Sequence, residues 1–207
     1  NKDKIFVTGI PVSTRFQQEF DKPAIYKDFE LNPNKKTILF FAGGGFGLGT
    51  ESTVNILKSF LDLKDELQIV AISGKNQKMK KQFDELHEEY GDNILKVFEY
   101  TDKVPELMNI STLVVTKPGG LTTSECLVCG LPMIIINPIP GQEEQNAEFL
   151  ESAGIAVWLK KHDNPKKVIN NLLHSPIRLT EMKENAKVIA RRNSTQRICN
   201  ILINSLN

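Results

Sequence analysis

The chain has 207 residues, of which 40% are hydrophobic and 25% are charged, a balance typical of a folded domain that excludes a disordered chain. The formal net charge is +1, from 26 basic and 25 acidic side chains, so the basic excess of a duplex-binding protein is missing and no nucleic-acid partner is expected. No apolar run approaches the roughly 20 residues of a membrane-spanning helix, and no signal-peptide pattern opens the sequence.

The first 36 residues are mixed, and regular alternation begins after them. Residues 4–12, KIFVTGIPV, predict a short strand that runs into a turn, and a polar, proline-containing stretch follows. From Thr37 onward, apolar β-rich runs alternate with segments of helical character. The expected strands are 37–42, 67–73, 94–98, 113–116, 133–137 and 155–159, and the expected helices lie near 50–61, 77–90, 104–108, 122–130 and 143–153, with two or three more before the C-terminus.

The strands are nearly continuous apolar runs, as in MIIIN at 133–137. Such runs are typical of strands that helices cover on both faces of a sheet. The alternation therefore predicts an α/β domain with a doubly wound parallel sheet and right-handed crossovers. Ligands of such sheets bind outside the carboxyl ends of the strands, so the strand-to-helix connections are the segments where a site is expected.

Residues 42–50, AGGGFGLGT, follow the first long strand, and five of the nine are glycine. Glycines let backbone N–H groups approach a ligand closely, and the helix expected next would attract phosphate at its N-terminus. The segment is no P-loop, because Gly44 and Gly49 have the required spacing but Thr50 replaces the lysine. The dinucleotide pattern GxGxxG also fails, at Leu48, which disfavours a Rossmann oxidoreductase. A flexible tight turn without a ligand is the alternative.

Residues 116–125, TKPGGLTTSE, follow the fourth strand and predict a second anion pocket. Gly119 and Gly120 can present successive amides, and Thr122 is expected to cap the next helix, with Glu125 in its first turn. The spacing of Thr122 and Glu125 is that of a capping box, which needs no ligand. The Glu125 carboxylate could equally accept hydrogen bonds from a ribose diol, and both interpretations remain open.

Residues 137–150, NPIPGQEEQNAEFL, follow the fifth strand. Gln142 and Asn146 are four residues apart and would share one helix face, where their amides suit sugar hydroxyls, and Glu143 adds an acceptor. A solvated polar helix face is the alternative. Residues 98–104, FEYTDKV, follow the third strand and offer an aromatic ring and backbone groups where a flat base could bind.

Two cysteines, Cys126 and Cys129, form a CxxC pair, but no second pair completes a zinc site. The residues between them are apolar, so buried thiols are favoured over redox chemistry. Three cysteines suit a reducing compartment and predict a cytoplasmic location.

No DxD pair is present, so no metal is expected, and helix termini and amides would neutralise a diphosphate. The basic run Lys75, Lys78, Lys80 and Lys81 favours a solvated helix face.

Together these segments resemble the C-terminal domain of GT-B glycosyltransferases, a group that includes the lipid II N-acetylglucosaminyltransferase of peptidoglycan synthesis. The similarity is greater to diacylglycerol glycosyltransferases, namely plant monogalactosyldiacylglycerol synthases and bacterial processive diglucosyldiacylglycerol synthases. It rests on TKPGG, PGQE-x-x-NA and SGKN (residues 73–76), in the family's order and spacing, and on TGIPVSTRF, which resembles the family's interdomain strand and linker. The resemblance implies that residues 1–36 connect to an acceptor domain outside this sequence and that 37–207 form the donor domain.

The resemblance also implies roles for individual residues. Gly44 and Gly45 would lie by the diphosphate, although Gly45 replaces a polar or histidine side chain of the family and has none to offer. Gly119, Gly120 and Thr122 would bind the phosphates, and Glu125 would bind the ribose. The backbone of Thr101 would recognise the uracil. The transferred sugar would contact Gln142, Glu143 and Asn146.

The function that the resemblance implies is inverting transfer of a hexose from a UDP-sugar, UDP-glucose or UDP-galactose, to a lipid hydroxyl, with diacylglycerol as the expected acceptor. The acceptor site and the general base would lie in the other domain, so this chain alone should bind the donor with little or no turnover. Peripheral contact with the inner face of the cell membrane is compatible with that function in the whole protein. A UDP-sugar-binding or sensing module without chemistry is the alternative.

Overall fold

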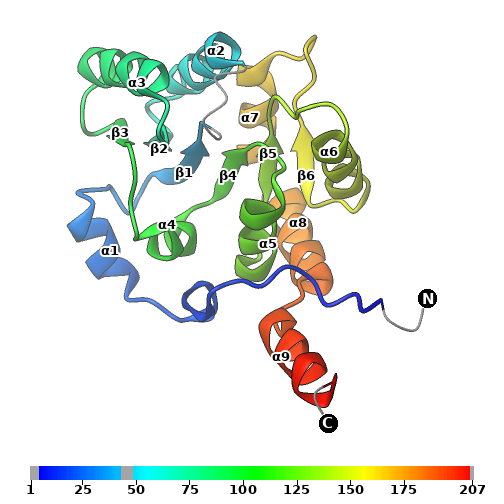
Figure 1. Ribbon diagram of the computed structural model, residues 1–207. Coiled ribbons are helices and arrows are strands. Elements are labelled where there is room, and N and C mark those ends of the chain that lie inside the picture. The colour runs from blue at the N-terminus through cyan, green and yellow to red at the C-terminus, as the bar shows by residue number, and fades with distance from the viewer. Residues whose placement is uncertain (1–4, 43–48, 206–207) are drawn as a thin grey trace.

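The computed structural model describes residues 5–42 and 49–205, which form a six-stranded parallel sheet with helices on both faces (Figure 1). The strand order is β3-β2-β1-β4-β5-β6, and all five neighbouring pairs are parallel. The doubly wound parallel sheet expected from the alternating pattern is therefore confirmed. The strands are β1 (Lys36–Phe41), β2 (Leu67–Ile72), β3 (Leu95–Phe98), β4 (Leu113–Thr116), β5 (Met133–Ile135) and β6 (Ala156–Trp158).

The helices lie close to the expected ranges, and several of their ends have a local cause. Asn76 caps α3 by accepting a hydrogen bond from the Met79 amide at 3.1 Å, and the helix stops at Gly91, whose φ is 82°. The expected bounds of the first two helices after Thr37 are those observed, since both apolar periodicity and caps are local. The helices are α1 (Lys22–Asp28), α2 (Thr50–Leu61), α3 (Gln77–Tyr90), α4 (Val104–Ile110), α5 (Gly120–Cys129), α6 (Gln142–Ser152), α7 (Pro165–Leu173), α8 (Pro176–Ile189) and α9 (Ser194–Ser205), with a 3-10 turn η2 (Thr14–Gln17) before them.

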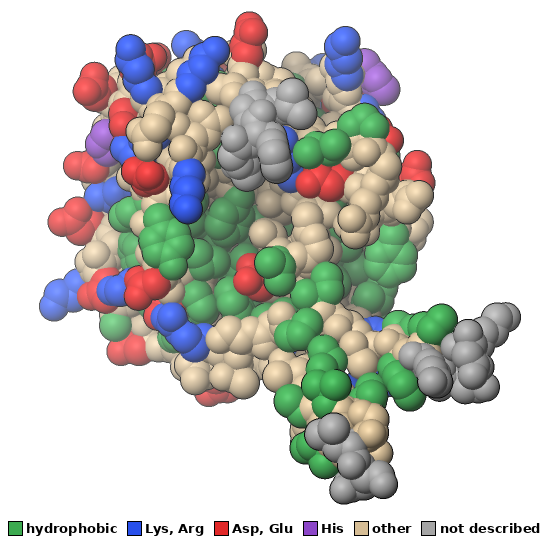
Figure 2. All heavy atoms as spheres, viewed as in Figure 1, with side chains coloured by type: hydrophobic (Ala, Val, Ile, Leu, Met, Phe, Trp, Pro, Cys, Tyr) green, Lys and Arg blue, Asp and Glu red, His purple; other side chains and the backbone are tan. Residues whose placement is uncertain are grey.

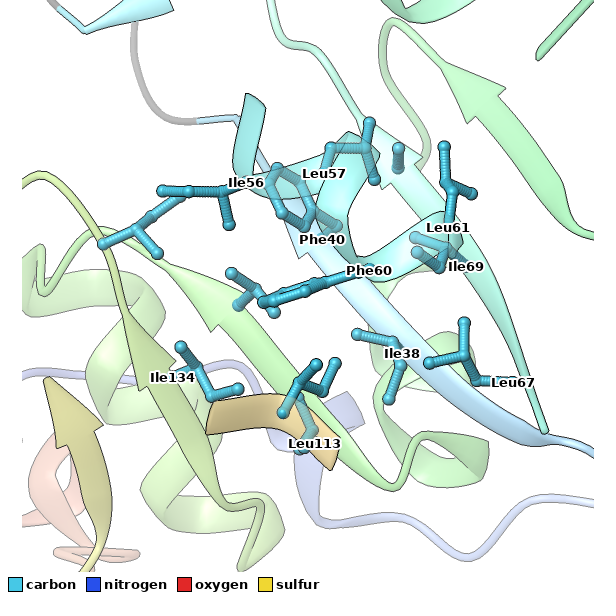
Figure 3. Close-up of a cluster of buried hydrophobic side chains, with 14 of the residues drawn as sticks. Ile38, Phe40, Ile56, Leu57, Phe60, Leu61, Leu67, Ile69, Leu113 and Ile134 are labelled. Atoms are coloured by element: carbon cyan, nitrogen blue, oxygen red, sulfur yellow. The ribbon is translucent and has the colours of Figure 1, made fainter. Parts of the chain in front are cut away.

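Alternate residues of each strand face two separate hydrophobic clusters. Ile38 and Phe40 of β1 point into a first cluster with α2, α3 and α7, and Leu39 points into a second with α1, α4, α5 and α6. Figure 3 shows part of the first cluster, with the Phe40 ring beside Phe60. The ring centroids lie 6.3 Å apart in this edge-on pair, and Phe40 meets Phe83 edge-on at 5.9 Å. Burial on both faces explains why the strands are apolar throughout.

The short strand expected at residues 4–12 is absent from the part of this segment that the structure describes. Residues 5–13 have no strand assignment, and Ile5, Phe6 and Val7 are 71%, 58% and 66% exposed. A strand forms only when its backbone pairs with another, and this segment passes the start of α5 and the start of α9 instead of a sheet edge (Figure 1). Its connection to another domain stays a prediction.

The N-terminal segment and α9 both project from the body of the molecule, and apolar side chains gather on both projections (Figure 2). The rest of the N-terminal region is packed, because Ile25 of α1, Phe29 and Leu31 are buried in the second cluster. Across residues 5–42 and 49–205, no helix is long and apolar enough to span a membrane.

Candidate functional site

The sheet has one point where the strand order reverses, between β1 and β4. From β1 the chain builds outward through β2 and β3, then returns to β4 on the other side of β1 and continues to β5 and β6. The helices that follow these two strands, α2 and α5, pack into the hydrophobic clusters on opposite faces of the sheet, and a ligand crevice is expected at such a reversal point. The glycine-rich segment and the TKPGG segment, both predicted to bind phosphate, leave these two strands.

A cleft of about 290 Å³ opens at this edge of the sheet. It contains three of the residues predicted from sequence, Gly119, Thr122 and Glu143. The sequence interpretation gave its other members no role of their own, although Thr116 and Lys117 belong to the TKPGG segment and Gly74 to the SGKN segment. These are Phe41 and Ile72 at the ends of β1 and β2, Gly74 after β2, and Thr116 and Lys117 at the end of β4.

Lys117 is the cationic side chain among the residues that line this cleft. It is half-buried and immediately precedes Pro118 in the turn between β4 and α5. A lysine ammonium is a compact charge that binds phosphate oxygens well. Lys117 is therefore the lining residue that could bring a positive charge to an anion, in addition to the amides that the sequence predicted.

Helix α5 begins two residues earlier than the sequence predicted, and this corrects the role expected for Thr122. Gly119 is the N-cap, with φ −68° and ψ 143°, so the helix starts at Gly120 and Thr122 lies in its first turn. No side chain caps the helix, and the capping box of Thr122 and Glu125 is not formed. By helix geometry the amides of 120–122 have no partner within α5, which leaves them available to an anion.

Glu125 lies one turn after Thr122 on α5, beyond the first turn in which it was expected. It is half-buried, and its carboxylate has no hydrogen-bond or ion-pair partner among the described residues. Burial raises the pKa of this carboxyl above its usual range. The capping role is ruled out, since the capping box is not formed, and hydrogen bonding of Glu125 to a ribose diol stays a prediction.

Helix α6 starts beside the cleft, and the three polar residues predicted to bind the sugar differ in exposure and in their hydrogen bonds. Gln142 is exposed, while the Glu143 Oε2 atom accepts a hydrogen bond from the Ile139 amide at 2.8 Å. Asn146 donates its Nδ2 to the Pro118 carbonyl at 2.9 Å. Asn146 thus ties α6 to the TKPGG turn, leaving its Oδ1 atom as an acceptor.

Asn137, just beyond β5, is a residue that the sequence interpretation placed in a ligand segment without a role. Its backbone φ is 44°, so β5 ends before it, two residues short of the expected strand. Its amide bridges to α2, because Ser52 Oγ donates to Oδ1 and Nδ2 donates to Thr53 Oγ1, both at 3.0 Å.

In residues 98–104, the segment expected to bind a flat base, some groups are already engaged in contacts within the domain. The Phe98 ring lies edge-on to Phe29 with centroids 5.8 Å apart, and its carbonyl accepts a hydrogen bond from the Ser73 amide at 2.9 Å. Thr101 Oγ1 accepts from the Lys103 amide at 3.1 Å. Phe98 is therefore a packing residue, and base recognition by the Thr101 backbone stays a prediction.

Gly44 and Gly45, the residues expected beside a diphosphate, lie outside the described residues. The segment resumes at Gly49, the N-cap of α2, whose φ is 78° and which has no side-chain cap. The α2 N-terminus is therefore a second helix start at the end of the predicted phosphate segment.

The CxxC thiols are placed as the apolar sequence between them indicates. Cys126 is fully buried, and burial raises its pKa well above the usual value. Cys129 is half-buried beside Met108, and burial raises its pKa to about 12. No group of three or more potential metal ligands occurs among residues 5–42 and 49–205. Lys78 and Lys81 are exposed on α3 and Lys80 pairs with Asp84, which fits the solvated helix face, whereas Lys75 is exposed in the turn before the helix.

Comparison with known proteins matches nearly the whole chain. Residues 38–198 match the family described as "Glycosyltransferase family 28 C-terminal domain". The processive diacylglycerol beta-glucosyltransferase of Bacillus licheniformis is 34% identical over 197 residues, covering 95% of this chain and 50% of that protein. The chain thus spans about half the length of the curated relatives it matches.

Solved structures share the fold. Acinetobacter baumannii MurG, a GT-B glycosyltransferase, has a TM-score of 0.64 at 22% identity, over 93% of this chain and 56% of that one. The S. aureus MnaA–UDP co-structure has a TM-score of 0.70 at 20% identity, over 88% of this chain and 48% of that one. At these identities the likeness shows the fold alone.

Proposed function

The chain belongs to the glycosyltransferase family 28 C-terminal domain family, and from this premise we propose that it binds a UDP-hexose, the donor from which the whole protein transfers the sugar to a lipid hydroxyl. The observation that carries the proposal is the cleft at the reversal point of the sheet. It places the N-terminus of α5, Lys117 and the first turn of α6 around one space.

The diphosphate is proposed to lie at the start of α5. The amides of 120–122 and the positive end of the helix dipole face it, and Lys117 supplies a full charge. In the transfer, the acceptor oxygen forms a bond to the anomeric carbon, and the bond from that carbon to the diphosphate breaks. The departing UDP keeps the electron pair, so groups already fixed at the diphosphate stabilise the charge that develops there.

The rest of the donor is proposed to extend to both sides of the diphosphate. On one side Glu125 accepts hydrogen bonds from the ribose hydroxyls, and the backbone near Thr101 contacts the base. On the other side the second carboxylate oxygen of Glu143 and the Oδ1 atom of Asn146 accept hydrogen bonds from the sugar, with Gln142 at the exposed rim. The general base is expected outside this chain, and no metal is required for these contacts.

Calorimetric titration of the chain with UDP, uridine, UDP-glucose, UDP-galactose and NADH, in the presence of a chelator, tests the proposal. The UDP compounds should bind, uridine should bind more weakly because it lacks the diphosphate, and NADH should bind most weakly. Tighter binding of NADH than of UDP, or UDP binding that appears only with magnesium or manganese, would contradict it. Comparing the two UDP-hexoses then identifies the preferred donor.

A further inference from the structure

The backbone of Asn137 adopts a conformation that most residues avoid. Its φ is 44°, and among residues 5–42 and 49–205 only Glu30, at φ 50°, is another non-glycine residue with positive φ. The left-handed region strains a residue that has a Cβ atom, although asparagine tolerates it better than most. This conformation lets Asn137 turn the chain out of β5 while its side chain reaches α2.

The Asn137 side chain makes two hydrogen bonds to successive residues in the first turns of α2. Ser52 Oγ donates to its Oδ1, and its Nδ2 donates to Thr53 Oγ1, each at 3.0 Å. Thr53 is fully buried, so this end of the bridge is anchored in the core. A two-point contact to consecutive residues fixes both the position and the rotation of the helix start.

The same side chain also contacts the residue that precedes α2. A Cβ atom built on Gly49 would lie 3.4 Å from Asn137 Nδ2 and 3.5 Å from its Cγ, so the Gly49 backbone rests against the amide. Gly49 is the last residue of the glycine-rich segment and the N-cap of α2. The contact therefore reaches the point where that segment joins the helix.

Asn137 is connected to the cleft on its other side as well. Two residues later the Ile139 amide donates to Glu143 Oε2 at 2.8 Å, and Glu143 lines the cleft. A short chain of contacts thus links the start of α2, through Asn137 and the turn after β5, to the first turn of α6.

We propose that Asn137 is a positioning residue for the donor site, which holds the end of the glycine-rich segment at a fixed place relative to the first turn of α6. The inference rests on the proposed function, because the first turn of α6 carries the proposed sugar ligands and the glycine-rich segment is the one that the family resemblance places beside the diphosphate. Asn137 acts through Ser52, Thr53 and Glu143 and needs no contact with the donor.

The test is the Asn137→Gly variant, because glycine accepts the positive φ and lacks the side chain that makes the bridge to α2 and the contact with Gly49. We expect its affinity for the UDP-hexose that the wild type binds to fall by about tenfold, the order of effect of one or two lost hydrogen bonds. Glu30→Gly is the matched control, because Glu30 is the other described non-glycine residue with positive φ. Its side chain pairs with Lys96, far from the cleft. The donor affinity of Glu30→Gly should equal that of the wild type.

A double-mutant cycle with Ser52→Ala separates positioning from a general loss of stability. Ser52→Ala alone should weaken donor binding, and in the Asn137→Gly background it should add little, because the bridge is already gone. Unfolding midpoints of all variants show whether each one is folded at the temperature of titration. Fully additive effects, or an Asn137→Gly variant that binds as the wild type does, would overturn the inference alone. A wild type that binds no UDP compound would remove the proposed function instead.

Discussion

At the scale of single residues, Glu125 combines burial with the absence of a partner among the described residues, and this makes its role testable by pH. Burial raises the pKa of the carboxyl, so the side chain becomes protonated at a higher pH than an exposed glutamate does. We predict that affinity for UDP-glucose falls as the pH is lowered from about 8 to about 5, since a protonated carboxyl is a poorer acceptor for ribose hydroxyls. Calorimetry across that range measures the effect.

Glu125→Gln provides the control and tests the fold at the same time. A raised pKa means that the protonated form favours the folded state, and that this stability is lost as the pH rises through the folded pKa. At neutral pH the variant should therefore unfold at the same temperature as the wild type or higher, yet bind UDP-glucose more weakly and with little pH dependence. An unchanged pH profile in the variant would show that another group titrates.

At the scale of elements, the start of α5 depends on two adjacent glycines with different surroundings. Gly119 lines the cleft, and a Cβ atom on it would meet nothing within 4 Å, whereas one on Gly120 would lie 2.8 Å from Ile10 Cδ1. We predict that Gly119→Ala weakens UDP binding by about tenfold and changes the unfolding free energy by less than about 1 kcal/mol.

Gly120→Ala is the matched comparison for that prediction. Its methyl group displaces the end of the Ile10 side chain on the side of the N-terminal segment, so UDP affinity should change less than in Gly119→Ala. Titration and thermal unfolding of both variants supply the measurements. Equal losses of UDP affinity in the two variants would indicate that a methyl group anywhere at the start of α5 weakens binding, whichever face of the helix carries it.

At the scale of the whole molecule, the rates at which a reagent modifies the thiols measure how often the domain unfolds. Cys199 on α9 is exposed, whereas Cys126 lies in the second hydrophobic cluster and has a strongly raised pKa. A thiol reagent should modify Cys199 at once and Cys126 only when the domain unfolds. Adding UDP should slow modification of Cys126, because a ligand that binds only the folded state stabilises it.

Mass spectrometry of the labelled chain over time distinguishes the two sites, and Cys199 serves as the internal control. Its rate should not change with UDP, because α9 projects from the body of the molecule (Figure 1) and none of its residues lines the cleft. Rapid modification of Cys126 without UDP would mean that the core around α5 opens locally, which would contradict a single cooperative unit.

The sequence by itself determined the class of fold and most of its elements. Thr50–Leu61 and Gln77–Tyr90 were predicted with the bounds observed, because apolar spacing and Asn76 capping act within one or two helical turns. The apolar strands indicated a sheet buried on both faces, and glycines at strand ends marked the connections that flank its reversal point. The family motifs added the expected ligand and the roles of the site residues.

Only the tertiary structure decided which side chains are free and which are engaged. Gly119 starts α5 in place of Thr122, which removes the capping box and leaves Glu125 without a partner among the described residues. The Asn146 side chain donates a hydrogen bond to the Pro118 carbonyl, and the Asn137 side chain, just after β5, donates one to Thr53 of α2. Both hydrogen bonds join residues that are far apart in the chain. Such contacts depend on the order of the strands, and no local pattern of residues encodes that order.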